Sequence, residues 1–320
     1  MNIAIISLNG RSSKALAESC KRWFEPVDAL SLKLFEVHLK DGEHVLTYNE
    51  EPLKEYDCVY IRGSYKYAMI QKAIANYFNK KSYMPIKPEA FAIGHDKFLT
   101  LLELQKAKIP VPKTYYVPNK KLAKGLLDKV EFPIIIKVQE GTHGKGVMIA
   151  ESKKSAIAML DTLESLKKPY IIQEFVETKD TSDIRAIVCM DKVLASYKRV
   201  ANSEDFRSNI HSGGKREVHD LTKEEEKIAI NSAKCVGVEI CGVDILNSKT
   251  PSVIEINLSP SLCGIEGVSH INVVNEVARS LYKQTLKFKD KQEKRIKKKI
   301  QKKEEKKNGK NGNGKHSENH

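Results

Sequence analysis

Phe132-Pro-Ile-Ile-Ile-Lys-Val-Gln-Glu-Gly-Thr-His-Gly-Lys-Gly-Val-Met-Ile-Ala150 is the stretch on which the prediction of the fold depends. Its apolar run, interrupted once by Lys137, predicts a buried strand, and residues 147–150 predict a second one. The glycine-rich segment 141–146 lies between them, so the pattern predicts a hairpin. Glycines let a backbone approach a ligand and turn N–H groups towards an anion. On glycine content alone, a plain tight hairpin and a flexible nucleotide lid are equally good interpretations.

Two better-known phosphate-binding loops do not match this stretch. Both of those loops open a helix, whereas residues 147–150 continue as a strand. No Gly-Lys-Ser/Thr follows the glycines, and their order is not that of a dinucleotide-binding fingerprint. The choice between hairpin and lid therefore depends on the rest of the chain.

The composition predicts a cytoplasmic protein of two or three domains. The chain has 320 residues, of which 41% are hydrophobic, and no apolar run approaches the length of a transmembrane helix. Residues 2–7 read as a strand and not as a signal peptide. The six cysteines are scattered without a Cys-x-x-Cys pair, which favours reduced, buried thiols over a disulfide framework or a zinc site.

Alternating strands and helices in the first part of the chain predict a small parallel α/β domain that ends near Pro85 and Pro88. Ligands bind at the carboxyl ends of the strands in such sheets. Arg62 and Gly63 end the strand predicted at 56–62, so they are candidates for a pocket wall. A solvated arginine at a strand end is an equally good interpretation.

Three oxygen-bearing residues near the end of the chain form a candidate metal site. Glu255 and Asn257 stand two apart on a short predicted strand, so their side chains share a face. Asp244 lies on the preceding strand, which we expect to pair antiparallel with it. Carboxylate and amide oxygens suit Mg²⁺ better than zinc. The alternative is a buried acidic pair that is neutralised by a lysine or an arginine.

Two lysines are candidates for binding an anion. Lys137 stands inside a strand that otherwise reads as buried on both faces, where a charge is costly unless it meets an opposite charge. A triphosphate beside a glycine-rich lid is the natural partner. Lys97, at the start of a predicted helix, is weaker evidence because a surface lysine explains it equally well.

Several further runs follow one another in a fixed order: His95-Asp-Lys-Phe-Leu-Thr, Ile109-Pro-Val-Pro-Lys-Thr114, Pro133-Ile-Ile-Ile-Lys137, Glu140-Gly-Thr-His-Gly-Lys-Gly-Val147, Gln173-Glu-Phe, Asp183-Ile-Arg185, Arg199-Val-Ala, Asp205-Phe-Arg-Ser-Asn209, His211-Ser-Gly-Gly-Lys215, Gly242-Val-Asp244 and Glu255-Ile-Asn-Leu-Ser-Pro260. Together they resemble the ATP-grasp superfamily and, within it, the RimK-like glutamate ligases. The resemblance covers residues 86–275. It implies an α/β (α+β) ATP-grasp fold, in which a small parallel N-terminal domain precedes two lobes with the nucleotide between them. In that fold the glycine-rich segment 141–146 would be a lid over the nucleotide.

The resemblance also implies roles for individual residues. The residues implied to bind ATP are Lys97, Lys137, Gly144, Lys145, Gly146, Glu174, Phe175, Asp183, Arg207, Ser208 and Asn209. Among these, Glu174 and Phe175 would line the adenine pocket, and Asp183 would hold the ribose. Arg199, Arg207 and Asn209 would act on the transferred phosphate or the acyl intermediate. Asp244, Glu255 and Asn257 would bind Mg²⁺ or Mn²⁺, with two ions expected.

The activity that the resemblance implies is ligation of a carboxylate to an amine. ATP would phosphorylate the carboxylate, and the amine of an amino acid, most often glutamate, would displace the phosphate. The acceptor, a protein C-terminus or a coenzyme, stays open because residues 1–85 match the family only loosely. The loop 259–272, which includes Glu266 and His270, would shape the amine site. A homo-oligomer is compatible with this interpretation.

The predicted domains are 1–88, 89–172, 173–286 and a lysine-rich disordered tail at 287–320. The last helix is predicted from about Val273 to Gln284, and a transient charged helix is an alternative for the first part of the tail. The tail carries +9 of the formal net charge of +14. A solubilising extension is the simpler interpretation of that charge. The alternative is contact with RNA or ribosomes, which would make the protein a nucleic-acid-binding adaptor with an ATP-grasp scaffold.

Overall fold

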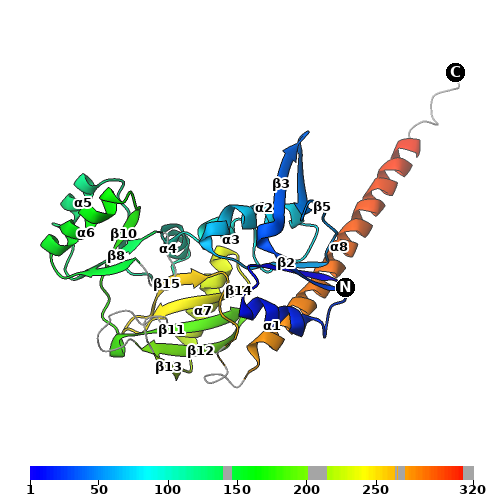
Figure 1. Cartoon of the computed structure of the whole chain (residues 1–320). Helices are drawn as coiled ribbons and strands as arrows, with labels where there is room; N and C mark the ends of the chain where they lie inside the picture. The colour runs from blue at the N-terminus through cyan, green and yellow to red at the C-terminus, as the bar shows by residue number, and fades with distance from the viewer. Residues whose placement is uncertain (140–145, 201–214, 264, 266–270, 313–320) are drawn as a thin grey trace.

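The structure is a computed structural model of the whole chain (Figure 1), and it describes residues 1–139, 146–200, 215–263, 265 and 271–312. The described residues form four sheets. Three of these sheets belong to successive parts of the chain, and the fourth is a small hairpin sheet that stands out from the N-terminal part (Figure 1). None of the described helices is long and apolar enough to cross a membrane.

The N-terminal sheet has the strand order β2-β1-β6, and both pairings are parallel. Its strands are β1 (Ile3–Ser7), β2 (Val27–Ser31) and β6 (Cys58–Ile61). The helices that follow β1 and β6 are α1 (Arg11–Cys20) and α2 (Ala68–Phe78), the latter after a short 3₁₀ turn, η2 (Tyr65–Tyr67). Every residue of β1 and β6 is buried, as expected for parallel strands. The predicted parallel α/β unit is confirmed.

The hairpin sheet is inserted between β2 and β6. It consists of β3 (Phe35–Lys40), β4 (Glu43–Tyr48) and β5 (Glu51–Pro52), preceded by a 3₁₀ turn, η1 (Leu32–Leu34). Asp41 and Gly42 have φ of 53° and 79°, so the turn that the Asp-Gly pair predicts is present. The sequence of segment 33–37 fits either the end of a helix or a strand. In the structure it is the end of η1 and the start of β3.

The central lobe contains the stretch 132–150. Its antiparallel sheet has the order β7-β10-β8-β9, with β7 (Thr114–Tyr115), β8 (Ile134–Val138), β9 (Val147–Ala150) and β10 (Tyr170–Glu174). Helices α5 (Lys120–Leu126) and α6 (Lys153–Ser165) pack with it around a separate core. Ser152 caps α6 as predicted. The predicted hairpin is confirmed, because β8 and β9 pair and the Val138 N–H donates to the Gly146 carbonyl at 2.8 Å.

Two helices link the N-terminal domain to the central lobe. They are α3 (Ala90–Ile93) and α4 (Lys97–Lys106). Phe91, Leu101 and Leu104 are buried in the large core shared by the N-terminal domain and the C-terminal lobe, whereas the separate core of the central lobe begins at Ala123. By packing, α3 therefore lies with α2 of the N-terminal domain and α4 lies with the C-terminal lobe, whereas the boundaries of independently folding domains stay a prediction.

The C-terminal lobe is an antiparallel sheet with the order β13-β12-β11-β14-β15. Its strands are β11 (Ser182–Cys189), β12 (Lys192–Val200), β13 (Lys215–Val218), β14 (Ile240–Leu246) and β15 (Ser252–Asn257), and η3 (Lys179–Thr181) precedes β11. Helix α7 (Lys223–Val236) begins with the predicted capping box of Thr222 and Glu225. It ends at Gly237, whose φ of +81° is the left-handed conformation that glycine adopts readily.

The last helix, α8 (Val273–Gly312), corrects a prediction. The sequence predicts a helix ending near Gln284, then a lysine-rich tail with a transient charged helix at its start and disorder at its end, but α8 continues without interruption to Gly312. Its Lys, Glu and Gln residues have high helix propensity, and no proline interrupts them. The helix is also attached beyond the predicted end, because Lys289 pairs with Asp57 and the Gln292 amide donates to the Lys80 carbonyl at 2.7 Å. Residues 313–320 lie outside the described part.

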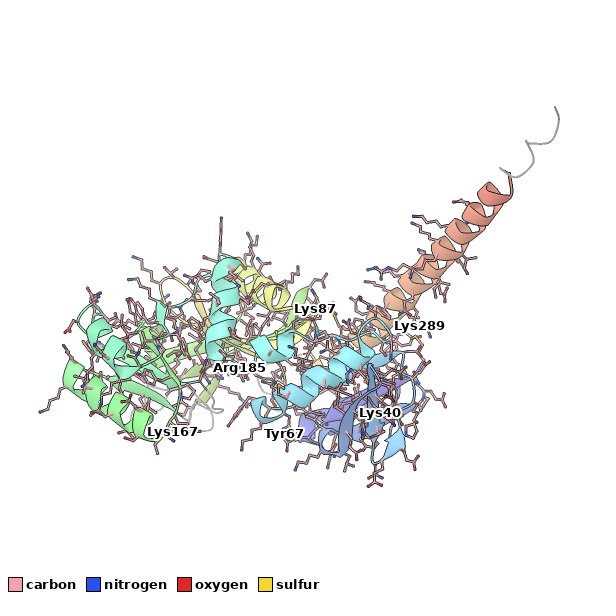
Figure 2. All side chains as sticks on the ribbon, turned by 90° about the horizontal axis from the view of Figure 1, so that it is seen from above. Lys40, Tyr67, Lys87, Lys167, Arg185 and Lys289 are labelled. Carbon is pink, nitrogen blue, oxygen red and sulfur yellow. The ribbon has the colours of Figure 1, made fainter. Side chains whose placement is uncertain are left out.

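The distal part of α8 projects from the body of the molecule with long side chains on all sides (Figure 2). Ile296 and Ile300 are 57% and 50% exposed, so this part of the helix packs on nothing that the structure describes. The positive charge of the sequence is therefore displayed on a projecting helix.

Candidate active site

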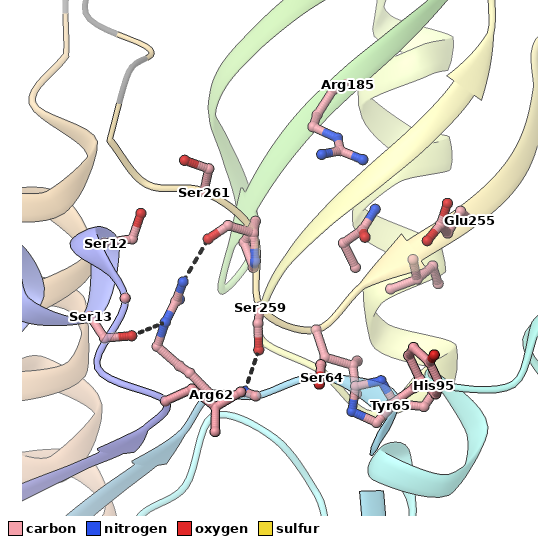
Figure 3. Close-up of a pocket in the computed structure, with 18 of the residues that line it drawn as sticks. Ser12, Ser13, Arg62, Ser64, Tyr65, His95, Arg185, Glu255, Ser259 and Ser261 are labelled. Carbon is pink, nitrogen blue, oxygen red and sulfur yellow. Dashed lines mark hydrogen bonds between the residues drawn. The ribbon is translucent and has the colours of Figure 1, made fainter. Parts of the chain in front are cut away.

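A cavity of about 650 Å³ lies between the N-terminal domain and the C-terminal sheet (Figure 3). One wall comes from the start of α1 and the residues after β6, and the other comes from β12, β13 and β15, with the start of α4 beside them. Arg62 and Gly63 line the first wall, which confirms their predicted place at a pocket. The cavity thus opens where the carboxyl ends of β1 and β6 face the predicted metal strand.

The three predicted metal ligands come together. Asp244 on β14 is directly opposite Glu255 on β15, and Asn257 lies two residues further along β15. The Asn257 side-chain amide donates to Asp244 Oδ2 at 3.4 Å. With the amide turned over, its nitrogen would instead donate to Glu255 Oε1 at 3.3 Å. In either orientation, two carboxylates and one amide form a single cluster.

Two arginines neutralise the aspartate of this cluster. Arg185 donates from Nε to Asp244 Oδ1 at 2.6 Å and from Nη2 to Oδ2 at 2.5 Å. Arg199 Nη2 lies 3.0 Å from the same Oδ2. Burial raises the pKa of the Asp244 carboxyl, but the two guanidinium charges outweigh burial and hold the pKa below its usual range. The alternative of an acidic group paired with arginine is therefore realised at Asp244.

Arg199 also pairs with Asp183 across the sheet. The two residues are opposite one another on β11 and β12, and Arg199 Nε donates to Asp183 Oδ1 at 2.7 Å. A second contact joins Arg199 Nη2 to Asp183 Oδ2. Both side chains are buried. Arg199 thus holds two carboxylates, and the roles of Asp183 at a ribose and of Arg199 at the transferred phosphate stay predictions.

Glu255 is the member of the cluster whose charge is least compensated. Burial and the neighbouring charge of Asp244 raise the pKa of Glu255, against the opposing effect of Lys97. Among the described residues, no three His, Cys, Asp or Glu side chains form a metal site, because the third group here is the amide of Asn257. An all-oxygen set beside a carboxylate with incomplete neutralisation fits Mg²⁺, and Asp244, Glu255 and Asn257 are the residues that would hold it.

The two predicted lysines both approach this corner. Lys137 Nζ donates to Gln173 Oε1 at 2.6 Å, and Lys97 Nζ donates to the Gln139 carbonyl at 3.3 Å. Burial lowers the pKa of Lys137 to about 8, and the negative charge of Glu255 opposes part of that shift. Lys137 is therefore close enough to the acidic cluster for their charges to interact. Its ammonium group could also bind an anion there.

The predicted adenine residues lie at the end of β10, away from the cavity. The Glu174 carboxylate accepts from the Tyr115 hydroxyl at 2.8 Å and pairs with Lys113 at 3.3 Å. Phe175 is 40% exposed. Gly146 has φ of +82° and closes the hairpin. The other predicted residues, Gly144, Lys145, Arg207, Ser208 and Asn209, lie outside the described residues, as do Glu266 and His270.

The residue that sequence reasoning missed is Arg185. It occurs in one of the quoted runs, but no role was predicted for it, although it makes two hydrogen bonds to Asp244. The signal was available, because Asp183 and Arg185 are two apart on a strand and must share a face. The register that places Asp244 opposite Arg185 could not be read from the sequence.

Comparisons with known proteins bear on the fold and on the family. A solved structure of the ATP-grasp ligase PsnB, complexed with minimal precursor, Mg and ADP, has a TM-score of 0.67 and 18% identity and covers 89% of this chain and 98% of its own. The RimK domain protein from Sphaerobacter thermophilus DSM 20745 has a TM-score of 0.68 and 15% identity, covering 88% and 99%. At these identities the likeness shows the fold, which is that of an ATP-grasp protein.

The sequence comparisons are more specific. A probable alpha-L-glutamate ligase of Vibrio atlanticus (strain LGP32) is 35% identical over 271 residues, which are 83% of this chain and 90% of the relative. The model of the RimK-like ATP-grasp domain matches residues 94–281. The chain belongs to the RimK-like ATP-grasp family, and it is a ligase.

Proposed function

We propose that the protein joins a carboxylate to the amine of an amino acid, glutamate, through an acyl phosphate formed with ATP. The observation that carries the proposal is the convergence of Asp244, Glu255 and Asn257 at one end of a cavity that the N-terminal domain closes. A carboxylate is a poor electrophile because its leaving group would be oxide, and phosphorylation supplies a better leaving group. The relatives' name and the ADP and Mg in a similar ligase support this choice.

Each group of residues has a separate proposed role, which follows from its position. Lys137 and Lys97 would hold the ATP phosphates, while Glu174 and Phe175 would flank the adenine. Asp244, Glu255 and Asn257 would hold Mg²⁺ or Mn²⁺, and the ions, two in number, would neutralise charge on the phosphoryl group in transfer. Arg199 is held rigidly by Asp183, so its charge needs no rearrangement during the reaction.

The test is ADP release by the purified protein with ATP, Mg²⁺ and glutamate, with and without candidate acceptors. We expect release that requires both glutamate and an acceptor, together with a product whose mass has increased by glutamate. Mass spectrometry of a cell extract incubated with the enzyme, ATP and labelled glutamate would identify the acceptor. Absence of any amino-acid-dependent ADP release would contradict the proposal.

A second candidate function rests on α8. Its distal part is basic and projects from the body, so it could attract RNA or a ribosome by charge (Figure 2). As an adaptor, the protein would bind RNA in a salt-sensitive way and would lose that binding on deletion of residues 294–320. RNA binding without amino-acid-dependent ADP release would favour this second candidate over ligation.

A further inference from the structure

The cavity is strongly cationic. Its described wall includes six arginine or lysine residues, Arg11, Arg62, Lys97, Arg185, Arg199 and Arg216, but a single carboxylate, that of Glu255. The residues predicted to meet adenine do not line it, and neither does the half-buried Lys137. One end of the cavity is therefore the metal end, at Glu255 and Asn257, and the other end belongs to something other than the base of the nucleotide.

Arg62 dominates that other end. Arg62 is 5% exposed, and its guanidinium donates to three neutral acceptors: Ser13 Oγ at 3.1 Å, the Tyr60 hydroxyl at 3.0 Å and the Pro260 carbonyl at 2.6 Å. Figure 3 shows the bond to Ser13. No carboxylate among the described residues forms an ion pair with it. A guanidinium has five N–H donors. Two donors and the whole positive charge of Arg62 thus have no anionic partner in the part of the chain that the structure describes.

The surroundings of Arg62 hold this end of the cavity in place. The Gly63 N–H donates to Ser259 Oγ at 2.9 Å, and Ser12 Oγ accepts from the Leu262 N–H at 3.0 Å. These bonds and the one from Arg62 to Pro260 tie the loop after β15 to the N-terminal domain (Figure 3). A rigid wall with a buried, uncompensated cation is suited to bind an anion without rearrangement.

Arg11 supplies a second cation at the same end. It is the first residue of α1, lines the cavity and is exposed, and it has no hydrogen bond or ion pair to any described residue. A cation at the start of a helix is opposed by the helix dipole, so this placement gains nothing for stability. Both arginines are therefore available to a ligand that enters the cavity.

We propose that the end of the cavity formed by Arg62 and Arg11 binds a carboxylate that does not react, while the reacting carboxyl group lies at the metal end. The inference rests on the proposed function, because the non-nucleotide substrates of such a ligation are carboxylates. The guanidinium fork of Arg62 matches a carboxylate. The group has two possible sources, the amino acid that supplies the amine or the acidic end of a peptide acceptor, and both share this chemistry.

The test measures binding without turnover, in the presence of Mg²⁺ and ADP. The probes are L-glutamate, its analogues L-glutamine and 4-aminobutyrate, and a short peptide ending in glutamate with its counterpart ending in glutamine. The wild-type protein should bind either L-glutamate more tightly than its two analogues, or the peptide ending in glutamate more tightly than the peptide ending in glutamine. The expected difference is about 10- to 100-fold. Arg62→Gln should remove most of that discrimination, and Arg62→Lys should restore part of it.

If the Arg62→Gln protein does not fold, the Arg11→Gln protein tests the same end of the cavity. We expect it to weaken binding of the same probe about threefold, since Arg11 is exposed. Arg22→Gln is the matched control, because Arg22 is an exposed arginine just beyond the other end of α1 and does not line the cavity. Loss of discrimination with amino acids assigns the site to the amine donor, and loss with the peptides assigns it to the acceptor.

Unchanged discrimination in folded Arg62→Gln and Arg11→Gln proteins, or no discrimination by the wild type, overturns the proposal. Failure of the proposed function gives a different result. In that case no probe stimulates ADP release from ATP, whatever the binding measurements show at Arg62.

Discussion

Arg199 and Arg62 are buried on opposite walls of the same cavity, at 4% and 5% exposure, yet their surroundings differ. Arg199 meets the carboxylates of Asp183 and Asp244, whereas Arg62 meets two hydroxyl groups and a backbone carbonyl. A charge that is neutralised inside the protein helps to hold neighbouring side chains in fixed positions. A charge that is hydrogen-bonded but not neutralised is left for a ligand. The comparison separates the proposed metal end, where the charges are neutralised within the protein, from the proposed carboxylate-binding end at Arg62.

The largest effect is expected at the metal end of this comparison. Glu255→Gln should lower kcat at least about 100-fold, because it removes a ligand charge at the phosphoryl group. Since burial and Asp244 already raise the pKa of Glu255, loss of its charge should leave the free energy of unfolding unchanged or higher. Steady-state ADP release and urea unfolding measure the two quantities. Unchanged turnover would remove Glu255 from the metal site.

Asp244→Asn sharpens the same point. It should also abolish turnover, but here the free energy of unfolding should fall, because Arg185 and Arg199 lose the carboxylate that neutralises them. If the Asp244→Asn protein were as stable as the Glu255→Gln protein, Asp244 would not be the carboxylate that neutralises Arg185 and Arg199.

The two arginines should differ in their contribution to stability. Arg199→Gln should lower the free energy of unfolding by about 3 kcal/mol, because it leaves the buried carboxylates of Asp183 and Asp244 without their cation. Arg62→Gln removes hydrogen bonds to neutral groups and should cost about 1 to 2 kcal/mol. Urea unfolding of both variants, with Arg22→Gln as the control, measures the difference. Equal losses would break the comparison.

Lys137 is an intermediate case, because its hydrogen-bond acceptor is neutral but acidic groups are near. With a pKa of about 8, below the usual value for lysine, the ammonium form is present below that pH and is lost above it. ADP affinity of the nucleotide-free protein should therefore be flat below about pH 7.5 and fall by up to about tenfold per pH unit above 8. Lys137→Arg should make the profile flat. A flat profile in the wild type would contradict the role of Lys137.

The smallest effect on turnover is expected from the projecting helix. Deletion of residues 294–320 removes exposed charge far from the cavity wall and keeps the contacts of Lys289 and Gln292 with the body. The kcat and the KM for ATP should stay within about twofold, because exposed charges contribute little at such sites. A tenfold loss of kcat would show that the basic helix takes part in the reaction.

Local signals in the sequence predicted much of the fold correctly. The pairing of β8 with β9, the helix cap at Ser152, the capping box at Thr222 and the parallel N-terminal sheet follow from local patterns in the sequence, which is why they could be predicted directly. The end of α8 was misjudged because a polar, lysine-rich segment has no core to bury, yet its residues favour helix and its first turns are anchored on the N-terminal domain.

By itself, the sequence determined the residue types at the site, the convergence of Asp244, Glu255 and Asn257, and the family, because strand period and motif order are local properties. The tertiary structure alone decided which charges are neutralised. Arg185 reaches Asp244 only through the register of β11 and β14, and Arg62 reaches Pro260 across 198 residues of chain. Long-range register and packing set these contacts. For this reason the charge of Arg199 is neutralised by carboxylates, whereas the charge of Arg62 has no carboxylate partner among the described residues.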